Sequence, residues 1–298
     1  MPVAQFDYIA PTSIEEAVAA LARGGQGTRV MAGGTDLLVK IRHGMLFPER
    51  IVSLKRIPGL DTITFDKKNG LTIGATVLLA DVARHPKVRR YYPTVAEAAG
   101  ATANVQVRNM GTVVGNLCNG SPSADNAPTL MAMGATMVIV GPGGSRHLAL
   151  DRFFRGPGVT ALEAGEIVTA ITVPLPANGT GTAYHSLSQR GKLDCSAVGV
   201  GTLLTLDGER CTDARLIVGA CAPVPMRTPA AERMLIGQRL TDDLIRQAAQ
   251  TASEETTPIT DVRASASYRW KMVAVLTIRA LTDARKMASQ KRNSKLGN

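Results

Sequence analysis

Two short segments combine glycines with a threonine directly after apolar sequence, and they constrain this chain more than any other feature. The first reads Val-Met-Ala-Gly-Gly-Thr-Asp at residues 30–36, and the second reads Arg-Asn-Met-Gly-Thr-Val-Val-Gly-Asn at residues 108–116. Glycine has no Cβ atom, so the backbone amides of such a turn can approach an anion closely. Two loops of this kind suit a diphosphate held from two sides. For the first segment, an ordinary tight turn is the alternative interpretation.

Neither segment is one of the common nucleotide-binding loops. Neither has the spacing G-x-G-x-x-G of a Rossmann fold or G-x-x-x-x-G-K-[ST] of a P-loop, so neither of those devices is expected. The charge of Asp36 would repel a bare phosphate. We therefore expect Asp36 to accept a hydrogen bond from a sugar hydroxyl or to cap the next turn.

The N-terminal part has a compact βαβ pattern. Ser13 and Glu16 have the spacing of a capping box, which predicts a helix over residues 13–22. A buried strand is expected over residues 28–32, resumed by the apolar run 37–39, and another short strand is expected over residues 51–54.

The middle of the chain alternates strands and helices. Asn69-Gly70 lies between two strand-like runs and predicts a hairpin over residues 63–75. Pro174 and Pro176 mark a linker. The other elements expected before this linker are helices over residues 77–86, 93–104 and 128–134 and a strand over residues 136–140, and residues 151–154 and 166–173 close this part.

After the linker, strands are followed by helices, which indicates a separate α+β domain. Strand-like runs at residues 198–206 and 215–220 flank the Asp207-Gly208 turn, and helices are expected over residues 241–255 and 268–287. Residues 287–298 are expected to form a basic, solvated tail. Five basic residues and no acidic residue occur from Arg285 onward: Arg285, Lys286, Lys291, Arg292 and Lys295.

Composition argues against several classes of protein. The net charge is +10, of which this terminal segment supplies half, and aromatic residues make up only 4% of the 298 residues. A stacking platform for single-stranded nucleic acid needs more aromatic side chains, so no nucleic-acid partner is expected. A basic nucleic-acid-binding protein remains the alternative from another class, and it would show steeply salt-dependent binding.

The cysteines and the apolar runs limit the cofactors and the location. The four cysteines have no C-x-x-C spacing and the four histidines are isolated, so no metal or iron–sulfur site is expected in this chain. No apolar run approaches the roughly 20 residues of a membrane span, and the N-terminus does not resemble a signal peptide. We expect a cytoplasmic protein with reduced thiols and no integral membrane segment.

Taken in order, the motifs resemble those of the FAD-binding medium subunit of molybdenum hydroxylases. This family includes carbon monoxide dehydrogenase, xanthine dehydrogenase and 4-hydroxybenzoyl-CoA reductase. The resemblance covers nearly the whole chain, and the segment from Arg108 to Asp125 is its most specific part. The matching segments are residues 6–8, 11–13, 32–36, 71–75, 108–116, 121–125 and 261–263 and the pair Tyr268-Arg269.

The resemblance implies an α+β fold of two parts. A vanillyl-alcohol-oxidase (PCMH)-type FAD-binding domain is implied for residues 1–176, with subdomains of about 1–57 and 58–176. A smaller α+β C-terminal domain is implied for residues 177–286.

The resemblance also implies noncovalent FAD, bound between the subdomains. Both glycine loops hold the diphosphate, Asp125 bonds the polyol or ribose, and Thr102 and Val168 form the walls. The family often has lysine where Ser186 stands, and Arg190 or Lys192 would be the substitute. The implied cofactor-binding residues are Arg29, Val30, Met31, Ala32, Gly33, Gly34, Thr35, Asp36, Thr102, Gly111, Thr112, Val113, Val114, Gly115, Asn116, Asp125, Val168 and Lys192.

The implied function is electron transfer within a larger oxidoreductase. Electrons from iron–sulfur clusters on a partner subunit pass through FAD to NAD⁺, a quinone or another acceptor. The implied partners are a small [2Fe-2S] subunit and a large molybdopterin subunit, assembled as a dimer of heterotrimers. The alternative is a stand-alone FAD oxidoreductase for a small organic substrate, for which the sequence offers no clear acid or base.

Overall fold

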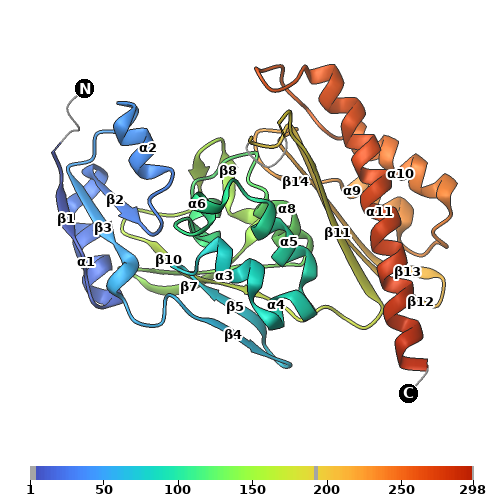
Figure 1. Cartoon of the computed structure of the whole chain (residues 1–298), viewed down its shortest axis with the longest axis horizontal. Helices are drawn as coiled ribbons and strands as arrows, with labels where there is room; N and C mark the ends of the chain where they lie inside the picture. Colours follow the sequence, from blue (N-terminus) through green and yellow to red (C-terminus); the bar gives the residue numbers. More distant parts are fainter. Residues whose placement is uncertain (1–4, 191–193, 297–298) are drawn as a thin grey trace.

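The computed structural model describes residues 5–190 and 194–296 and arranges three sheets in a row along the long axis of the molecule (Figure 1). A three-stranded sheet lies at the N-terminal end, a five-stranded sheet in the middle and a four-stranded sheet at the other end. The short strands β8 (Phe154–Gly156) and β9 (Val159–Thr160) pair separately.

The N-terminal sheet is the expected βαβ unit. Its strands run parallel in the order β1 (Asp7–Ile9), β3 (Arg50–Ser53), β2 (Thr28–Met31), and α1 (Ile14–Gly24) connects β1 to β2. At the start of α1, Glu16 N donates to Ser13 Oγ over 3.1 Å, as predicted. The Glu16 carboxylate accepts from the amide of Thr12 over 2.8 Å, one residue ahead of a capping box.

The predicted strand over residues 37–39 is wrong. This apolar run opens a helix, α2 (Leu37–Arg42), in which Ile41 is buried while Leu38 and Val39 are exposed. Gly34, at φ +75°, turns the chain out of the direction of β2 before the helix starts. Three consecutive apolar residues fit a strand or one turn of a helix equally well, so the pattern could not decide between them.

The central sheet is antiparallel, with helices stacked beside it. The predicted hairpin is present, and the Asp66 carboxylate holds its turn by accepting from the amides of Lys68 and Asn69, each over 2.7 Å. In sheet order the strands are β4 (Ile63–Asp66), β5 (Gly70–Gly74), β10 (Ile167–Val173), β6 (Thr136–Gly141) and β7 (Gly144–Ala149). The helices are α3 (Leu79–Arg84), α4 (Pro86–Tyr91), α5 (Pro93–Ala101), α6 (Val105–Arg108), α7 (Val113–Cys118) and α8 (Asn126–Ala132).

The C-terminal sheet is antiparallel and is followed by helices, as the order of patterns predicted, although the sequence predicts only the last two of the three and not the first. Its strands are β11 (Thr180–Leu187), β12 (Val198–Asp207), β13 (Arg210–Gly219) and β14 (Met226–Arg227), and its helices are α9 (Pro229–Leu235), α10 (Asp242–Glu254) and α11 (Ala266–Leu296). Helix α11 continues past the expected end at Met287, because Ala288 is buried and Met287 Sδ accepts from Thr182 N over 3.4 Å. Within the described residues, no helix is long and apolar enough to cross a membrane.

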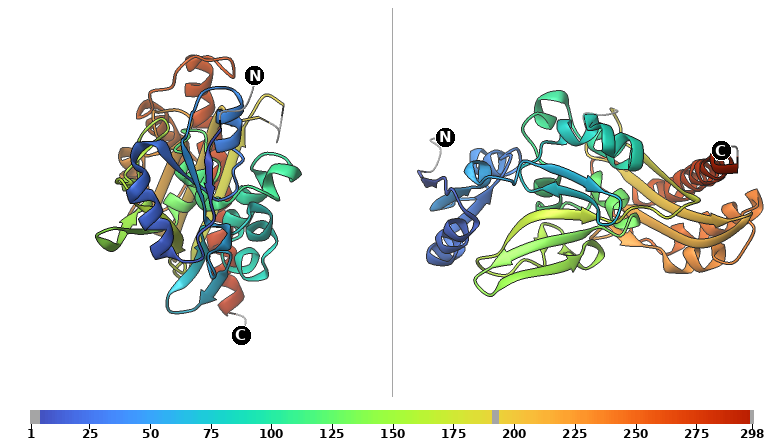
Figure 2. Two further views of the ribbon diagram at one scale, coloured as in Figure 1. Left: turned by 90° about the vertical axis from the view of Figure 1, so that its left-hand side faces the viewer. Right: turned by 90° about the horizontal axis from the view of Figure 1, so that it is seen from below.

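Glycines let helices approach the C-terminal sheet closely on both faces. A Cβ atom at Gly201 would lie 2.6 Å from the carbonyl carbon of Pro128 in α8, and one at Gly181 would lie 1.9 Å from Ala284 O in α11. The sheet therefore has α11 on one face and α8 on the other, and it extends away from the central sheet (Figure 2). This packing fixes the C-terminal sheet against the segment that follows the second glycine loop.

We predict that Gly181→Ala lowers the free energy of unfolding by about 1–3 kcal/mol, because the added methyl group would meet the backbone of α11. Urea unfolding measures the change. Gly143→Ala is the matched control, since a Cβ atom there would have no atom within 4 Å. Equal stability of the two variants would contradict the close packing of α11 on β11.

Candidate functional site

A cavity of about 790 Å³ opens where the N-terminal unit, the central unit and the start of the C-terminal unit meet. The cavity is lined by both glycine loops, by wall residues of β10 and by Asp194 and Cys195. Of the predicted site residues that the structure describes, all line it except Val113, which is completely buried beneath the second loop. Lys192 lies outside the described residues. The two glycine loops, far apart in the sequence, are thus parts of one site.

The two glycine loops touch each other through their backbones. A Cβ atom at Gly33 would lie 2.3 Å from Met110 O and 2.7 Å from the Cα atom of Gly111. Gly34 has a φ of +75°, a conformation that favours glycine. The Gly-Gly pair is therefore required by this loop-to-loop contact and by the turn into α2.

The second loop is anchored to the elements around it. Leu79 N donates to Gly111 O over 2.9 Å, and Gly111 N donates to Val107 O over 2.6 Å. Thr112 caps α7 by accepting from Gly115 N over 2.9 Å, and a Cβ atom at Gly115 would lie 2.8 Å from that hydroxyl. Gly115 thus makes room for the cap. Val114, where the family often has glycine, lies inside α7 and needs no positive φ.

Backbone amides of both loops remain free beside the cavity. In the part of the chain that the structure describes, the amides of residues 33–36 and those of Thr112 and Val114 donate to no protein acceptor. A group of free N–H donors on neighbouring residues binds anionic oxygens. Two such groups at one cavity fit the diphosphate that the sequence predicts.

Asn126, which the sequence analysis missed, connects a predicted wall residue, Thr102, with a predicted residue of the second glycine loop, Asn116. Its Nδ2 atom donates to Thr102 Oγ1 over 3.0 Å and to Asn116 Oδ1 over 2.9 Å, and its side chain is buried. Asn126 thereby sets the orientation of both groups. It follows Asp125 directly, but nothing in its local sequence marks it as part of a site.

Arg108 shapes the wall beside Thr102. Ala103 lines the cavity at φ +48°, a conformation that side-chain-bearing residues rarely adopt. Arg108 Nη1 donates to Ala103 O over 2.6 Å and to Thr102 O over 3.1 Å. The first residue of the second motif therefore holds a strained turn in place.

Asp125 connects the cavity to the C-terminal unit. Its Oδ1 atom accepts from Tyr184 Oη and from Ser196 Oγ, each over 2.7 Å. Burial raises the pKa of Asp125, and the hydrogen bonds from Ser196 and Tyr184 offset this only in part. Burial also raises the pKa of Tyr184, and the charge of Asp125 adds to that effect.

The charged residues at the cavity are largely committed to protein partners. Lys40 Nζ donates to Asn119 Oδ1 over 2.7 Å, and Arg29 Nη1 donates to the carbonyls of Gln26 and Thr28. Arg190, expected to replace a family lysine, pairs with Asp194. Asp36 lines the cavity at the N-cap position of α2 but makes no capping hydrogen bond. Of its two expected roles, capping is wrong and the contact with a sugar hydroxyl stays a prediction.

Comparison with known families agrees with this geometry. The family described as FAD binding domain in molybdopterin dehydrogenase matches residues 4–176, and the CO dehydrogenase flavoprotein C-terminal domain matches residues 182–284. The chain belongs to this family. It is an FAD-binding medium subunit of the molybdenum hydroxylases and an oxidoreductase flavoprotein subunit.

Named relatives match this medium subunit over almost its whole length. The carbon monoxide dehydrogenase medium chain of Hydrogenophaga pseudoflava is 33% identical, over 94% of this chain and 97% of the relative. The glyceraldehyde dehydrogenase medium chain of Sulfolobus acidocaldarius is 32% identical, over 94% of this chain and 98% of the relative. Among solved structures, CO dehydrogenase from Oligotropha carboxidovorans has a TM-score of 0.92 at 32% identity and covers 96% of this chain and all of its own.

We predict opposite pH effects for two carboxylates of the medium subunit. The pKa of Asp125 is raised in the folded state, so the folded protein binds the carboxyl proton more tightly than the unfolded chain does. Ionisation of Asp125 therefore lowers the free energy of unfolding as the pH rises above about 4. Asp125→Asn keeps an acceptor for Tyr184 and Ser196 but does not titrate. Its free energy of unfolding, relative to wild type, should therefore increase with pH.

Asp66→Asn is the matched control. Hydrogen bonds from Asn69 and Lys68 lower the pKa of Asp66, so the wild type gains stability as Asp66 ionises, and this variant should lose stability relative to wild type with rising pH. Urea unfolding at a series of pH values measures both differences. Parallel profiles for the two variants would contradict the assignment.

Proposed function

We propose that this chain binds FAD noncovalently in the cavity between the two glycine loops and transfers electrons through it. The observation that supports this proposal is the convergence of two groups of free backbone amides, at residues 33–36 and at Thr112 and Val114, on one cavity. The cavity volume of about 790 Å³ lies in the range of sites for cofactors of this size. Bound FAD would supply the redox chemistry, while this chain binds, orients and shields it.

Each part of the proposed site has a distinct task. The free amides hold the diphosphate, Asp125 accepts from a hydroxyl of the polyol or ribose, and Thr102 and Val168 form walls. Asn126 orients Asn116 and Thr102. No histidine of the described residues lines the cavity, so we expect no covalent attachment of the flavin through histidine.

In the proposed electron route, iron–sulfur clusters on a partner reduce the FAD, which then reduces NAD⁺, a quinone or another acceptor. Within the described residues no group of three or more His, Cys, Asp or Glu side chains could hold a metal ion. The donor centre therefore belongs to another chain. We propose a small [2Fe-2S] subunit and a large molybdopterin subunit as partners, in a dimer of heterotrimers.

The proposed domain division follows the two hydrophobic cores. Residues 1–176 form the FAD-binding domain and residues 177–286 form the C-terminal domain. One core lies almost entirely before the linker, although Leu203 and Ile217 of the C-terminal sheet join it, and the other core lies wholly after it.

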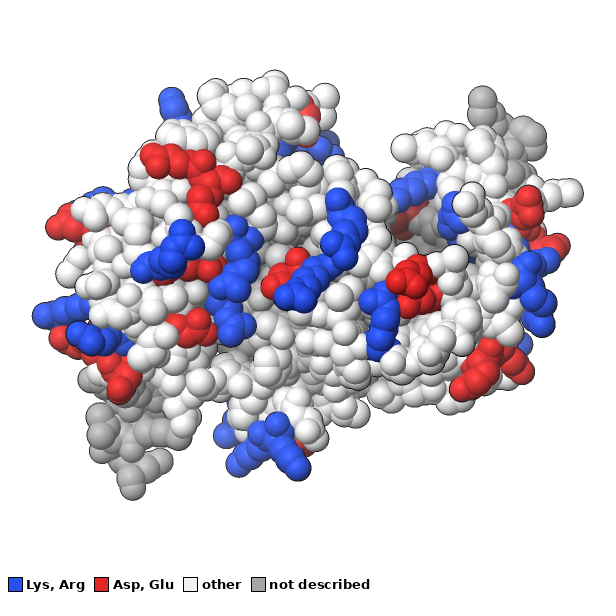
Figure 3. All heavy atoms as spheres, turned by 180° about the vertical axis from the view of Figure 1, so that it is seen from behind, with Lys and Arg blue, Asp and Glu red and all other residues white. Residues whose placement is uncertain are grey.

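On one face of the molecule, the surface charge favours this proposal over nucleic-acid binding. On the face shown in Figure 3, basic and acidic side chains alternate and are separated by uncharged surface. Binding to a polyanion would need a continuous basic stripe.

We predict that Gly33→Ala weakens FAD binding by about tenfold or more, because its methyl group would push the two loops apart at Met110. Fluorescence titration of the chain, stripped of flavin, with FAD measures the affinity, and circular dichroism measures folding. Gly100→Ala is the matched control, since its Cβ atom would lie at an ordinary 3.6 Å from Ala83. A Gly33→Ala variant with wild-type affinity would contradict the site.

We further predict that the chain, coexpressed with its genomic neighbours, copurifies with an iron–sulfur subunit and a molybdopterin subunit. The substrate of the complex should bleach the flavin absorption of the complex but not that of the isolated chain. Acid precipitation should release all the flavin. Bleaching of the isolated chain by an organic substrate would instead establish a stand-alone flavoenzyme.

A further inference from the structure

A strained residue of the C-terminal unit supports the loop that carries Asp125. Ala220 follows β13 at φ +65°, a conformation that alanine rarely adopts. In this conformation its amide donates to Pro122 O over 2.7 Å. The neighbours of Pro122, Ser121 and Ser123, line the cavity, and Ser123 N donates to Ser121 Oγ over 3.2 Å. The strained residue is therefore one hydrogen bond away from the cavity wall.

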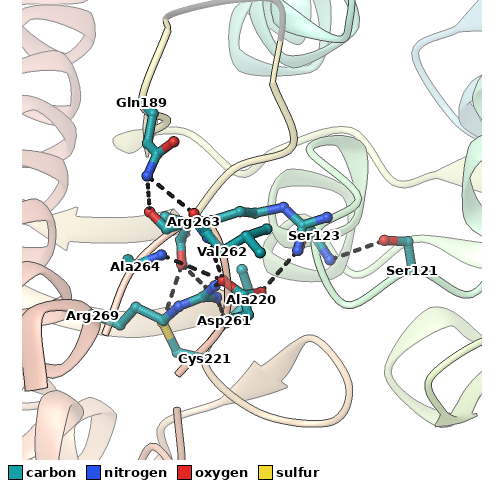
Figure 4. Close-up of polar contacts among 11 residues, drawn as sticks. Ser121, Ser123, Gln189, Ala220, Cys221, Asp261, Val262, Arg263, Ala264 and Arg269 are labelled. Carbon is teal, nitrogen blue, oxygen red and sulfur yellow. Dashed lines mark hydrogen bonds and ion pairs between the residues drawn. The ribbon is translucent and has the colours of Figure 1, made fainter. Parts of the chain in front are cut away.

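Arg269 of α11 supports this arrangement by bonding the carbonyl of Ala220 (Figure 4). Its guanidinium is almost completely buried, and its Nη1 atom donates to Ala220 O over 2.8 Å and to Ala197 O over 3.1 Å. Ala197 follows Ser196, whose hydroxyl donates to Asp125. One side chain thus supports two connections between the C-terminal unit and the loop of residues 121–125, and the bond from Tyr184 to Asp125 is a third.

Asp261 orients the guanidinium of Arg269. Its Oδ1 atom accepts from Arg269 Nη2 over 2.5 Å and from the amide of Arg263 over 2.8 Å, and its Oδ2 atom accepts from Arg263 Nη1 over 2.9 Å. Burial works to raise the pKa of Asp261, but hydrogen bonds from Arg263 and Arg269 outweigh it and lower the pKa to about 2. Gln189 Nε2 donates to Arg263 O over 2.7 Å and fixes the same segment (Figure 4).

We propose that Arg269, oriented by Asp261, is a positioning residue for the cofactor cavity. It holds Ala220 in the left-handed conformation, so that Ala220 binds Pro122 and the loop presents Asp125 to the cofactor. This inference rests on the proposed binding of FAD. It gives a task to the Asp-Val-Arg and Tyr-Arg motifs at residues 261–263 and 268–269, which take no part in lining the cavity.

The same arrangement occurs at Ala103, which lines the cavity. The described residues contain two non-glycine residues at positive φ, Ala103 and Ala220. In both cases an arginine donates to the carbonyl of the strained residue, Arg108 at Ala103 and Arg269 at Ala220. Such strain persists only where the surroundings enforce it, and it is concentrated at functional sites.

The test replaces Arg269 with lysine, which keeps the buried charge opposite Asp261 but cannot donate to both carbonyls and to Asp261 in a planar fork. We expect Arg269→Lys to weaken FAD binding by about tenfold, the cost of an unsupported left-handed alanine. In the chain without FAD, hydrogen exchange at the Ala220 amide should become faster. Adding Ala220→Gly should restore most of the FAD affinity, because glycine adopts the same φ without support.

Two matched controls separate positioning from general stability. Arg285 is also on α11 and also bonds a backbone carbonyl, that of Leu240, and a carboxylate, that of Asp242, but it lies away from the cavity. Arg285→Lys should leave FAD affinity unchanged. Ala103→Gly should not restore the Arg269→Lys variant, because Ala103 is supported by Arg108.

The outcomes distinguish this inference from the proposed function. Wild-type FAD affinity in Arg269→Lys, an equal loss in Arg285→Lys, or rescue by Ala103→Gly as good as that by Ala220→Gly would overturn the positioning role. A wild-type chain that does not bind FAD would overturn the proposed function instead. Hydrogen exchange at Ala220 would then decide the inference, and an unchanged rate in Arg269→Lys would refute it.

Discussion

The contact between the backbone of Gly33 and the backbone of Met110 and Gly111 is the constraint on which the site depends. It joins the parallel N-terminal sheet to the helices beside the central sheet, and the two backbones lie so close that no Cβ atom fits between them. The contact uses the glycine faces of both loops, and the amides of residues 33–36 and of Thr112 and Val114, which line the cavity, have no protein acceptor among the described residues. A larger residue at position 33 would separate the loops and disperse the two groups of donors.

The C-terminal unit is part of the site as well as a neighbour of it. Pro128 of α8 packs against Gly201 and Gly219, so the helix that follows Asp125 lies on the C-terminal sheet. Tyr184 and Ser196 then reach Asp125 across that interface. The proposed electron transfer needs a cofactor held at a fixed position, and this interface fixes one wall of the cavity relative to two units of the fold.

The sequence predicted local patterns well and long-range contacts poorly. The βαβ opening, the hairpin at Asn69-Gly70 and the α+β C-terminal domain follow from periodicity and turn residues, and the two glycine loops follow from their composition. The strand expected at residues 37–39 failed because three apolar residues carry no period. Asn126 was missed because its partners, Thr102 and Asn116, are set by the fold. Gly33 and Gly115 were expected to make room for the ligand, whereas each makes room for a neighbouring part of the chain.

The two strained alanines show how the site is prepared before a ligand arrives. A glycine at position 103 or 220 would adopt the same backbone angles at lower cost, but it would also adopt many others in the absence of the ligand. Alanine held by a buried or half-buried arginine keeps one conformation, so less ordering remains for the binding step. The arginines themselves are oriented by fixed acceptors, which for Arg269 include Asp261. Part of the rigidity of the cavity therefore comes from α11, a helix none of whose described residues lines it.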